Sequence, residues 1–276
     1  MVGLVKKVLI ASFLAARLVD PVFSSPGEHT GLEALLGVYG YAAQIYCDFS
    51  GYTDMAIGSA LLLGYRFPEN FDAPYKATSP QDFWHRWHMS LSSWLRDYLF
   101  IPLGGSKKGP TRTLVNLALT MVLGGLWHGA AWTFVIWGAF HGAGLIAHRL
   151  WSKSKAPAIG KLRAWAAWPW VARFLTFHFV CLGWVLFRAP SVDSAVELLA
   201  AIARPWTTGS WLSAMAVLSI GLGVLGPWFP TRWRVAARAR FSQLPVMAQG
   251  GAFALAVLII EAAGPQGIAP FIYFQF

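Results

Sequence analysis

The sequence predicts an all-α membrane protein whose helices cross the bilayer several times. Its 276 residues are 56% hydrophobic and only 12% charged, whereas soluble domains carry roughly 25% charged residues. The mean hydropathy is +0.50, and 15 Trp and 19 Phe leave few polar side chains to cover a water-exposed surface. Several separate apolar runs approach the roughly 20 residues that one helical crossing needs. A soluble enzyme is thereby excluded.

Each expected crossing follows from one apolar run. Residues 113–148 contain no Asp, Glu, Lys or Arg, which makes this stretch too long for one crossing. We expect two helices there, broken near Gly124, Gly125 and Gly129, because glycines interrupt the run at its middle. Single crossings are expected at residues 168–187, 211–229 and 245–263.

The N-terminal part predicts shorter helices. Residues 32–46 and 51–65 are apolar and are joined by the more polar residues 47–50, so we interpret them as a helical hairpin. The first twenty residues place a Lys6-Lys7 pair before a short apolar run, as a signal peptide would. Because no small-residue cleavage site precedes a polar chain, we expect a membrane segment or an amphipathic interfacial helix instead.

The net charge of +10 is interpreted as membrane orientation, with no nucleic-acid partner. The basic residues gather in short connections separated by two apolar segments each, so all of them can face the cytoplasm. Residues 188–210 then face the other side, where the aromatic residues 271–276 would anchor the chain end at the interface. The three clusters are Lys107, Lys108 and Arg112; Arg149, Lys153, Lys155, Lys161 and Arg163; and Arg232, Arg234, Arg238 and Arg240.

Residues 79–105 mix charged and aromatic side chains in a way that fits neither a crossing nor a loop. On a helical period, the apolar residues share one face, and His85 and His88 lie near its edge at i, i+3 spacing. Such a helix could line a polar cavity, since ionisable groups at membrane depth usually face a partner or a water-filled path. An interfacial helix lying flat on the membrane remains an equal alternative. The shared face consists of Trp84, Trp87, Leu91, Trp94 or Leu95, and Tyr98.

His128 is the strongest candidate for a general base. It lies between glycines at the centre of the uncharged run, and a neutral imidazole with an ordinary pKa near 6.5 can take up and return a proton. The alternative is a histidine that hydrogen-bonds between helices, which is how we interpret His141, His148 and His178. The histidines and the two cysteines, Cys47 and Cys181, match no metal-site spacing, so we expect no metal and two core cysteines.

Several ordered motifs between residues 46 and 148 resemble the membrane-bound O-acyltransferase (MBOAT) family, in particular its bacterial alginate O-acetyltransferase branch. In that family, the resemblance implies, His128 is the catalytic residue and His88 is the second functional histidine. The motifs are YCDFSGYTDMA at 46–56, FDAPY at 71–75, DFWHRWHMSLS at 82–92, WLRDY at 94–98, IPLGG at 101–105 and GGLWHGA at 124–130.

The resemblance also implies a fold and a reaction. We expect one integral-membrane domain over residues 1–276, with broken or re-entrant helices around a central funnel or tunnel and a catalytic core at residues 46–148. The family usually carries a further block of membrane helices upstream of this sequence, so we expect a fragment or a partner that supplies them. The bacterial inner membrane is the expected location. Substrate contacts are expected from Trp127, Trp87, His85, Arg96 and Asp97.

The expected reaction is transfer of an acetyl group to hydroxyls of an exported polysaccharide such as alginate, directly or through an extracytoplasmic acetyltransferase partner. The donor would be acetyl-CoA or another acyl thioester, and no bound cofactor is expected. Two alternatives remain open: a transporter or channel with a histidine proton relay, and an inactive assembly subunit.

Overall fold

The computed structural model describes residues 1–209 and 212–263, and within these ranges the chain forms helices and no strand. It divides into two compact units. One unit comprises residues 1–69 with those from 201 onward, and the other comprises residues 70–200. The all-α prediction is confirmed for the described residues, whereas the prediction of a single domain stays a prediction.

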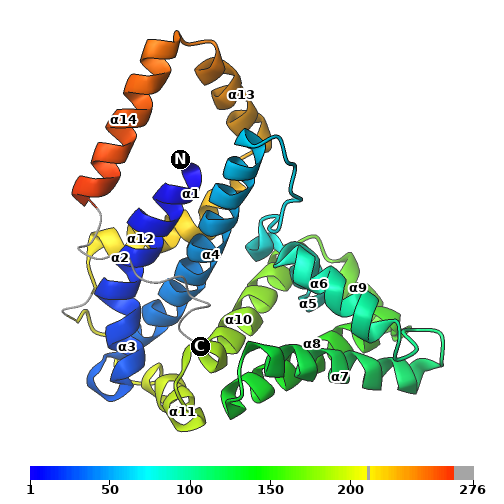
Figure 1. The fold of residues 1–276 in the computed structure, drawn as a ribbon. Helices are drawn as coiled ribbons and strands as arrows, with labels where there is room; N and C mark the ends of the chain where they lie inside the picture. The colour runs from blue at the N-terminus through cyan, green and yellow to red at the C-terminus, as the bar shows by residue number, and fades with distance from the viewer. Residues whose placement is uncertain (210–211, 264–276) are drawn as a thin grey trace. The chain divides into compact units, whose positions relative to one another are not determined.

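In the first unit, a helical run from residue 2 to residue 24 lies along the long helix α4 (Gly31–Leu62), as Figure 1 shows. The run contains α1 (Val2–Leu4), α2 (Ser12–Leu14) and α3 (Asp20–Ser24), joined by π-helical turns. Helix α12 (Ala214–Leu225) packs against α4 as well. The predicted helix near the N-terminus is therefore confirmed.

The helical hairpin predicted for residues 32–65 is wrong, because residues 31–62 form one continuous helix, α4. The polar residues that suggested a turn lie inside the unit and are neutralised by the neighbouring N-terminal run. Lys7 pairs with Asp48, and Lys6 pairs with Asp54 at 2.8 Å. Because both carboxylates are paired, their negative charges do not interrupt the helix.

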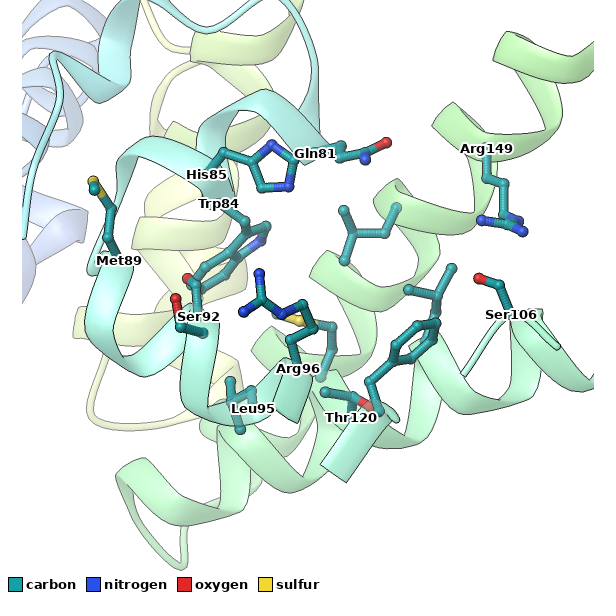
Figure 2. A pocket seen from close by; sticks show the side chains of 15 residues that line it. Gln81, Trp84, His85, Met89, Ser92, Leu95, Arg96, Ser106, Thr120 and Arg149 are labelled. Carbon is teal, nitrogen blue, oxygen red and sulfur yellow. The ribbon is translucent and has the colours of Figure 1, made fainter. Parts of the chain in front are cut away.

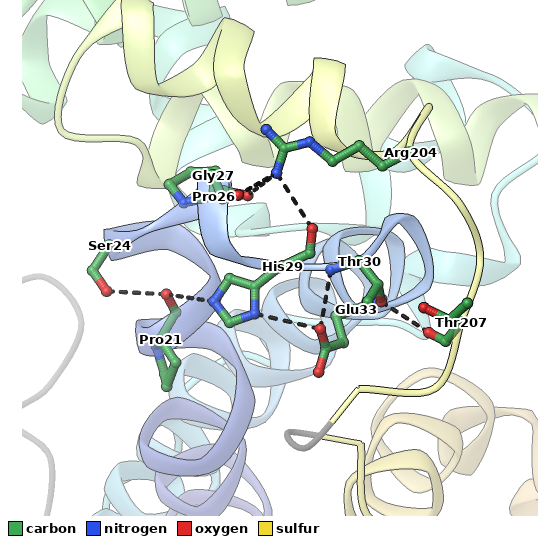
Figure 3. Close-up of polar contacts among 9 residues, drawn as sticks. All are labelled: Pro21, Ser24, Pro26, Gly27, His29, Thr30, Glu33, Arg204 and Thr207. Carbon is green, nitrogen blue, oxygen red and sulfur yellow. Dashed lines mark hydrogen bonds and ion pairs between the residues drawn. The ribbon is translucent and has the colours of Figure 1, made fainter.

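The start of α4 is fixed by the polar cluster in Figure 3. Thr30 and Glu33 form a reciprocal capping box, in which each side chain binds the other residue's backbone N–H. The Nε2 atom of His29 lies 3.2 Å from the carbonyl oxygen of Pro21. The Arg204 guanidinium donates to three backbone carbonyls, those of Pro26, Gly27 and His29. The loop before α4 is thereby tied to the segment after residue 200.

The remaining helices of this unit are largely exposed. Helix α12 is shorter than the predicted crossing at 211–229, because the chain passes into a 3-10 turn at Gly226–Trp228. Helix α13 (Thr231–Ser242) carries the third basic cluster, and α14 (Val246–Ala263) matches the predicted apolar helix at 245–263. The predicted aromatic anchor at 271–276 lies outside the described residues.

The second unit is built around a pair of helices, α7 (Pro110–His128) and α8 (Trp132–Lys153). The predicted break in the uncharged run is confirmed, and it falls at residues 129–131. Gly125 and Gly138 allow the two backbones to approach closely, since a Cβ atom at either position would collide with the backbone of the opposite helix. The pair forms one wall of the candidate site.

The other helices of this unit pack on that pair or follow it. Helix α10 (Trp168–Arg188) confirms the helix expected at 168–187 and packs against α8. Among the described residues it is also the one helix both long and apolar enough to cross a membrane. Shorter helices are α5 (Pro80–Arg86), α6 (Met89–Leu95), α9 (Pro157–Ala164) and α11 (Val192–Ala201).

Candidate active site

Residues 79–105 do not form the single helix that the periodicity predicted. Helix α5 starts at the Ser79 cap, whose hydroxyl accepts the backbone N–H of Asp82, and it ends at Arg86. His88 then adopts a left-handed backbone conformation with φ 44°, and α6 begins at Met89. The predicted apolar face is therefore divided between two short helices.

Asn70 explains this break. Its backbone carbonyl accepts the N–H of Met89 at 3.0 Å, and its side-chain oxygen accepts the N–H of Ser90 at 3.0 Å. These are first-turn N–H groups of α6, which have no partner inside their own helix. The same side-chain oxygen lies 3.3 Å from Nδ1 of His88. Asn70 therefore caps α6 and orients the His88 ring.

The break at His88 separates buried aromatic residues from exposed ones. Trp84 and Trp87 are 8% and 2% exposed, and Trp87 packs between Phe83 and Trp184. Trp94 and Tyr98, by contrast, stack on each other at the surface, with 5.5 Å between ring centroids. The predicted substrate-binding residue Trp87 thus lies in the aromatic core of the unit.

His128 ends α7 inside a box of aromatic rings. Its ring centroid lies 4.9 to 6.3 Å from those of four neighbours, and the ring is half-buried, so it is not sealed off from the surroundings. Glycine follows it at position 129, where a Cβ atom would lie 2.6 Å from the Phe134 ring. The four neighbours are Trp127, Phe134, Trp137 and Phe187.

The two candidate catalytic histidines both lie in this unit. His128 comes from the end of α7 and His88 from the break between α5 and α6, and the two rings are close enough to interact electrostatically. Burial lowers the pKa of His88 to about 4, so its ring is neutral at pH 7. A neutral imidazole has one hydrogen-bond donor and one acceptor, and either can contact a reacting group.

A pocket of about 430 Å³ lies between α5, α6, α7 and α8, and neither His88 nor His128 is among the residues that line it. Figure 2 shows Arg96 extending into it, with Ser106 and Arg149 at another side. Apolar and polar side chains both line it, and its volume is typical of small-molecule sites. The described residues that line it are Gln81, Trp84, His85, Met89, Ser92, Ser93, Leu95, Arg96, Phe100, Ser106, Leu117, Thr120, Met121, Leu145 and Arg149.

The residues predicted to contact substrate do not all line the same pocket. His85 and Arg96 line the pocket. Asp97 forms a bidentate pair with Arg96, at 2.7 and 3.0 Å, and this guanidinium lowers the pKa of the Asp97 carboxyl. Trp127 is 60% exposed beside His128. Their roles in binding stay predictions.

Sequence reasoning missed two residues of this region. Asn70 carried no local signal, because its partners are 18 to 20 positions further along the chain. Arg149 was grouped with a basic cluster and interpreted as an orientation signal, but its side chain lines the pocket. The available signal was its place directly after the uncharged run 113–148, which sets it apart from the lysines and arginines further along the cluster.

Comparison with known proteins gives the family. The family model described as MBOAT, membrane-bound O-acyltransferase family, matches residues 2–188. The chain belongs to this family. All the candidate site residues of this MBOAT chain lie inside the matched range, and the MBOAT match agrees with the composition of a membrane protein.

Three MBOAT relatives show how similar this chain is to individual proteins and how much of their length it covers. A probable alginate O-acetylase AlgI of Azotobacter vinelandii is 50% identical over 212 residues, covering 76% of this chain and 40% of the relative. The corresponding protein of Pseudomonas putida is 38% identical over 299 residues, covering 100% of this chain and 60% of the relative. A peptidoglycan O-acetyltransferase of Helicobacter pylori is 42% identical over 201 residues, covering 72% of this chain and 36% of the relative. The chain thus spans 36% to 60% of the length of these relatives.

Proposed function

We propose that this chain carries the catalytic core of a membrane O-acyltransferase that moves acetyl groups onto hydroxyls of an exported polysaccharide. The observation that carries the proposal is that His88 and His128, which lie 40 positions apart in the sequence, are within electrostatic range of each other in the second unit. Relatives named for alginate and for peptidoglycan support a polysaccharide acceptor. Alginate is the acceptor we favour.

His128 acts as the general base in this proposal. It removes the proton from an acceptor hydroxyl while the hydroxyl oxygen attacks the thioester carbonyl carbon. The C–S bond then breaks, and the leaving thiolate takes the proton back from His128, so the products are an acetyl ester and a free thiol. His88, neutral at pH 7, donates a hydrogen bond to the oxyanion that develops on the carbonyl oxygen.

The thioester donor, acetyl-CoA or another acyl thioester, binds in the pocket. Arg149 provides positive charge, Arg96 provides a guanidinium that is paired with Asp97, and His85 provides a ring nitrogen. Arginine forks match phosphate oxygens well, while apolar lining residues such as Leu117 and Met121 suit an uncharged arm. The pocket therefore fits a ligand with an anionic head and a neutral chain.

The surroundings of this reaction complete the proposal. The chain lies in the bacterial inner membrane as a multi-pass protein, and its broken helices surround a funnel that joins a cytoplasmic donor to an acceptor outside. Support comes from the family match and from the breaks at residues 87–88 and 129–131. An extracytoplasmic acetyltransferase partner can take over the acetyl group for the final transfer.

A complementation experiment tests the function. A strain lacking its own polymer acetyltransferase receives this chain, and the ester content of the secreted polymer is measured. We expect acetylation with the unchanged chain, and a loss of about 10² to 10⁴ in rate with His128→Ala, which is the range for a general base. His148→Ala serves as the matched control and should keep the activity.

The same experiment separates the two alternatives. A transporter would move solute without forming ester, and an inactive assembly subunit would do neither. Equal ester content with the unchanged chain and His128→Ala, at equal amounts of protein in the membrane, overturns the proposed role of His128.

A further inference from the structure

Helix α13 is a strongly basic segment of the first unit. It carries four arginines and no acidic residue, and the sequence has no Asp or Glu between Glu197 and Glu261. The side chains of Arg232, Arg238 and Arg240 are exposed, and within the described part of the chain no ion pair reaches them. Their positive charges are therefore open to an anionic partner outside the chain.

Aromatic side chains on α13 lie between these charges. Trp233, Ala237 and Phe241 follow one another at i, i+4, i+8 spacing, which places them along one side of the helix, about 40° apart. Trp233 and Phe241 are 66% and 44% exposed. By the same geometry, Arg240 and Arg238 flank this row from its two sides. Helix α13 thus presents an exposed apolar face, formed by residues 233, 237 and 241, between arginines.

The helix that follows places α13 beside an apolar phase. Helix α14 has no charged residue before Glu261 and is exposed along most of its length, which is typical of a helix that lipid surrounds. It is tied to the end of α13, because Nε2 of Gln249 donates to the backbone carbonyl of Leu244 at 2.8 Å. The basic helix therefore lies where the chain passes from water into the apolar layer.

Membrane orientation by positive charge does not explain this arrangement. Orientation requires only that Lys and Arg stay on one side of the membrane, and it sets no position for aromatic residues. An apolar face flanked by arginines is instead typical of a helix that lies flat in the interface, with its rings below the headgroups and its guanidinium groups beside them.

We propose that α13 lies flat on the membrane and binds the headgroups of anionic phospholipids. Trp233 and Phe241 insert among the lipid chains near the headgroups. Arg238 and Arg240 contact phosphate oxygens, which guanidinium groups match in geometry and in charge. Anionic lipids are preferred over neutral ones, since each arginine near an anionic surface strengthens binding about fivefold.

A polarity-sensitive fluorescent label on each side of α13 tests this proposal. Ala237→Cys places the label in the apolar face, and Ala239→Cys places it on the opposite side, and both positions are exposed. The native cysteines, Cys47 and Cys181, are buried, so the label reacts at the introduced cysteine. The labelled full chain is reconstituted into vesicles of phosphatidylcholine, alone or mixed equally with phosphatidylglycerol, and the emission is recorded.

We expect phosphatidylglycerol to shift the emission of the Ala237→Cys label to shorter wavelength, while the Ala239→Cys label stays in water and keeps its emission. Arg238→Gln with Arg240→Gln should remove most of this shift, because two arginines supply a preference of about 30-fold for an anionic surface. Equal emission from both positions, or no effect of phosphatidylglycerol, overturns the proposal.

Two comparisons separate other sources of the effect. Lys153→Gln with Lys155→Gln removes the same charge from exposed positions outside α13 and should keep the shift; loss of the shift would mean that overall charge acts instead of contact. Inorganic phosphate or soluble alginate, added to vesicles of phosphatidylcholine alone, should leave the Ala237→Cys label unchanged. A shift with either would assign α13 to that anion, and the proposal of a lipid surface would be wrong.

Discussion

The two units of the chain treat buried ionisable side chains in opposite ways. In the first unit the buried carboxylates of α4 have basic partners: Asp48 pairs with Lys7, and Glu33 lies 3.6 Å from His29. In the second unit His141 has no polar partner among the described residues, and His88 is held by a neutral amide. The first unit thus buries its carboxylates in pairs, whereas the second unit buries imidazoles beside neutral groups.

Breaking one pair in the first unit should have the largest effect on stability. The Lys7 and Asp48 side chains are 12% and 8% exposed, so Asp48→Leu removes the carboxylate that pairs with a buried ammonium. We expect a loss of about 3–5 kcal/mol in the free energy of unfolding. Thermal unfolding of detergent-solubilised protein, together with the amount of protein in the membrane, measures this loss.

A double variant tests whether the lost stability comes from leaving one charge of the pair without the other. Lys7→Met with Asp48→Leu removes both charges and should regain most of the lost stability, because apolar residues of similar size often replace a buried pair without cost. If the double variant stays as unstable as the single one, the Lys7–Asp48 pair is not what keeps α4 continuous.

In the second unit, the next prediction concerns the helix cap formed by Asn70. Asn70→Ala removes the side-chain oxygen that caps α6 at Ser90 and faces His88. We expect about 1–2 kcal/mol of lost stability, which is typical of a helix cap, together with a fall in acetyl transfer because the His88 ring is released. Asn70→Asp keeps an acceptor and should restore stability. Equal activity in Asn70→Ala would contradict the orienting role.

Arg149 tests the pocket. Arg149→Gln removes a charge-assisted contact to an anionic head, so we expect KM for acetyl-CoA to rise about tenfold with little change in kcat. Arg163→Gln is the matched control, since Arg163 belongs to the same basic cluster but does not line the pocket. A rise in KM in both variants would mean that the charge acts from a distance rather than by contact.

The sequence predicted those parts of the fold whose signals are local. The absence of charge in residues 113–148 and the glycines near its centre foretold α7 and α8, since both signals lie within the helices they describe. The continuous α4 was not predicted, because the lysines that neutralise its carboxylates lie 41 and 48 positions away. Long-range pairing is not visible in a periodicity.

The candidate site shows the same limit. His88 and His128 were recognised as candidates from their own motifs, but the helix break at His88 depends on Asn70, which is 18 positions away. His141 was interpreted as an ordinary helix-contact residue. Nothing in its sequence neighbourhood indicates that its ring nitrogens are buried without a hydrogen-bond partner among the described residues. Both facts depend on how α5, α8 and α10 meet.

The smallest effect concerns the pH dependence of stability through His88. Because burial lowers its pKa from 6.5 to about 4, the unfolded chain binds more protons at this residue between those values. Stability from the neutral ring is full above pH 6.5 and is lost as the pH falls toward 4. At pH 5.5 the loss is about 1 kcal/mol. His88→Gln should reduce the acid sensitivity of unfolding by that amount, and a parallel pH profile for both proteins would show that His88 titrates normally in the folded chain.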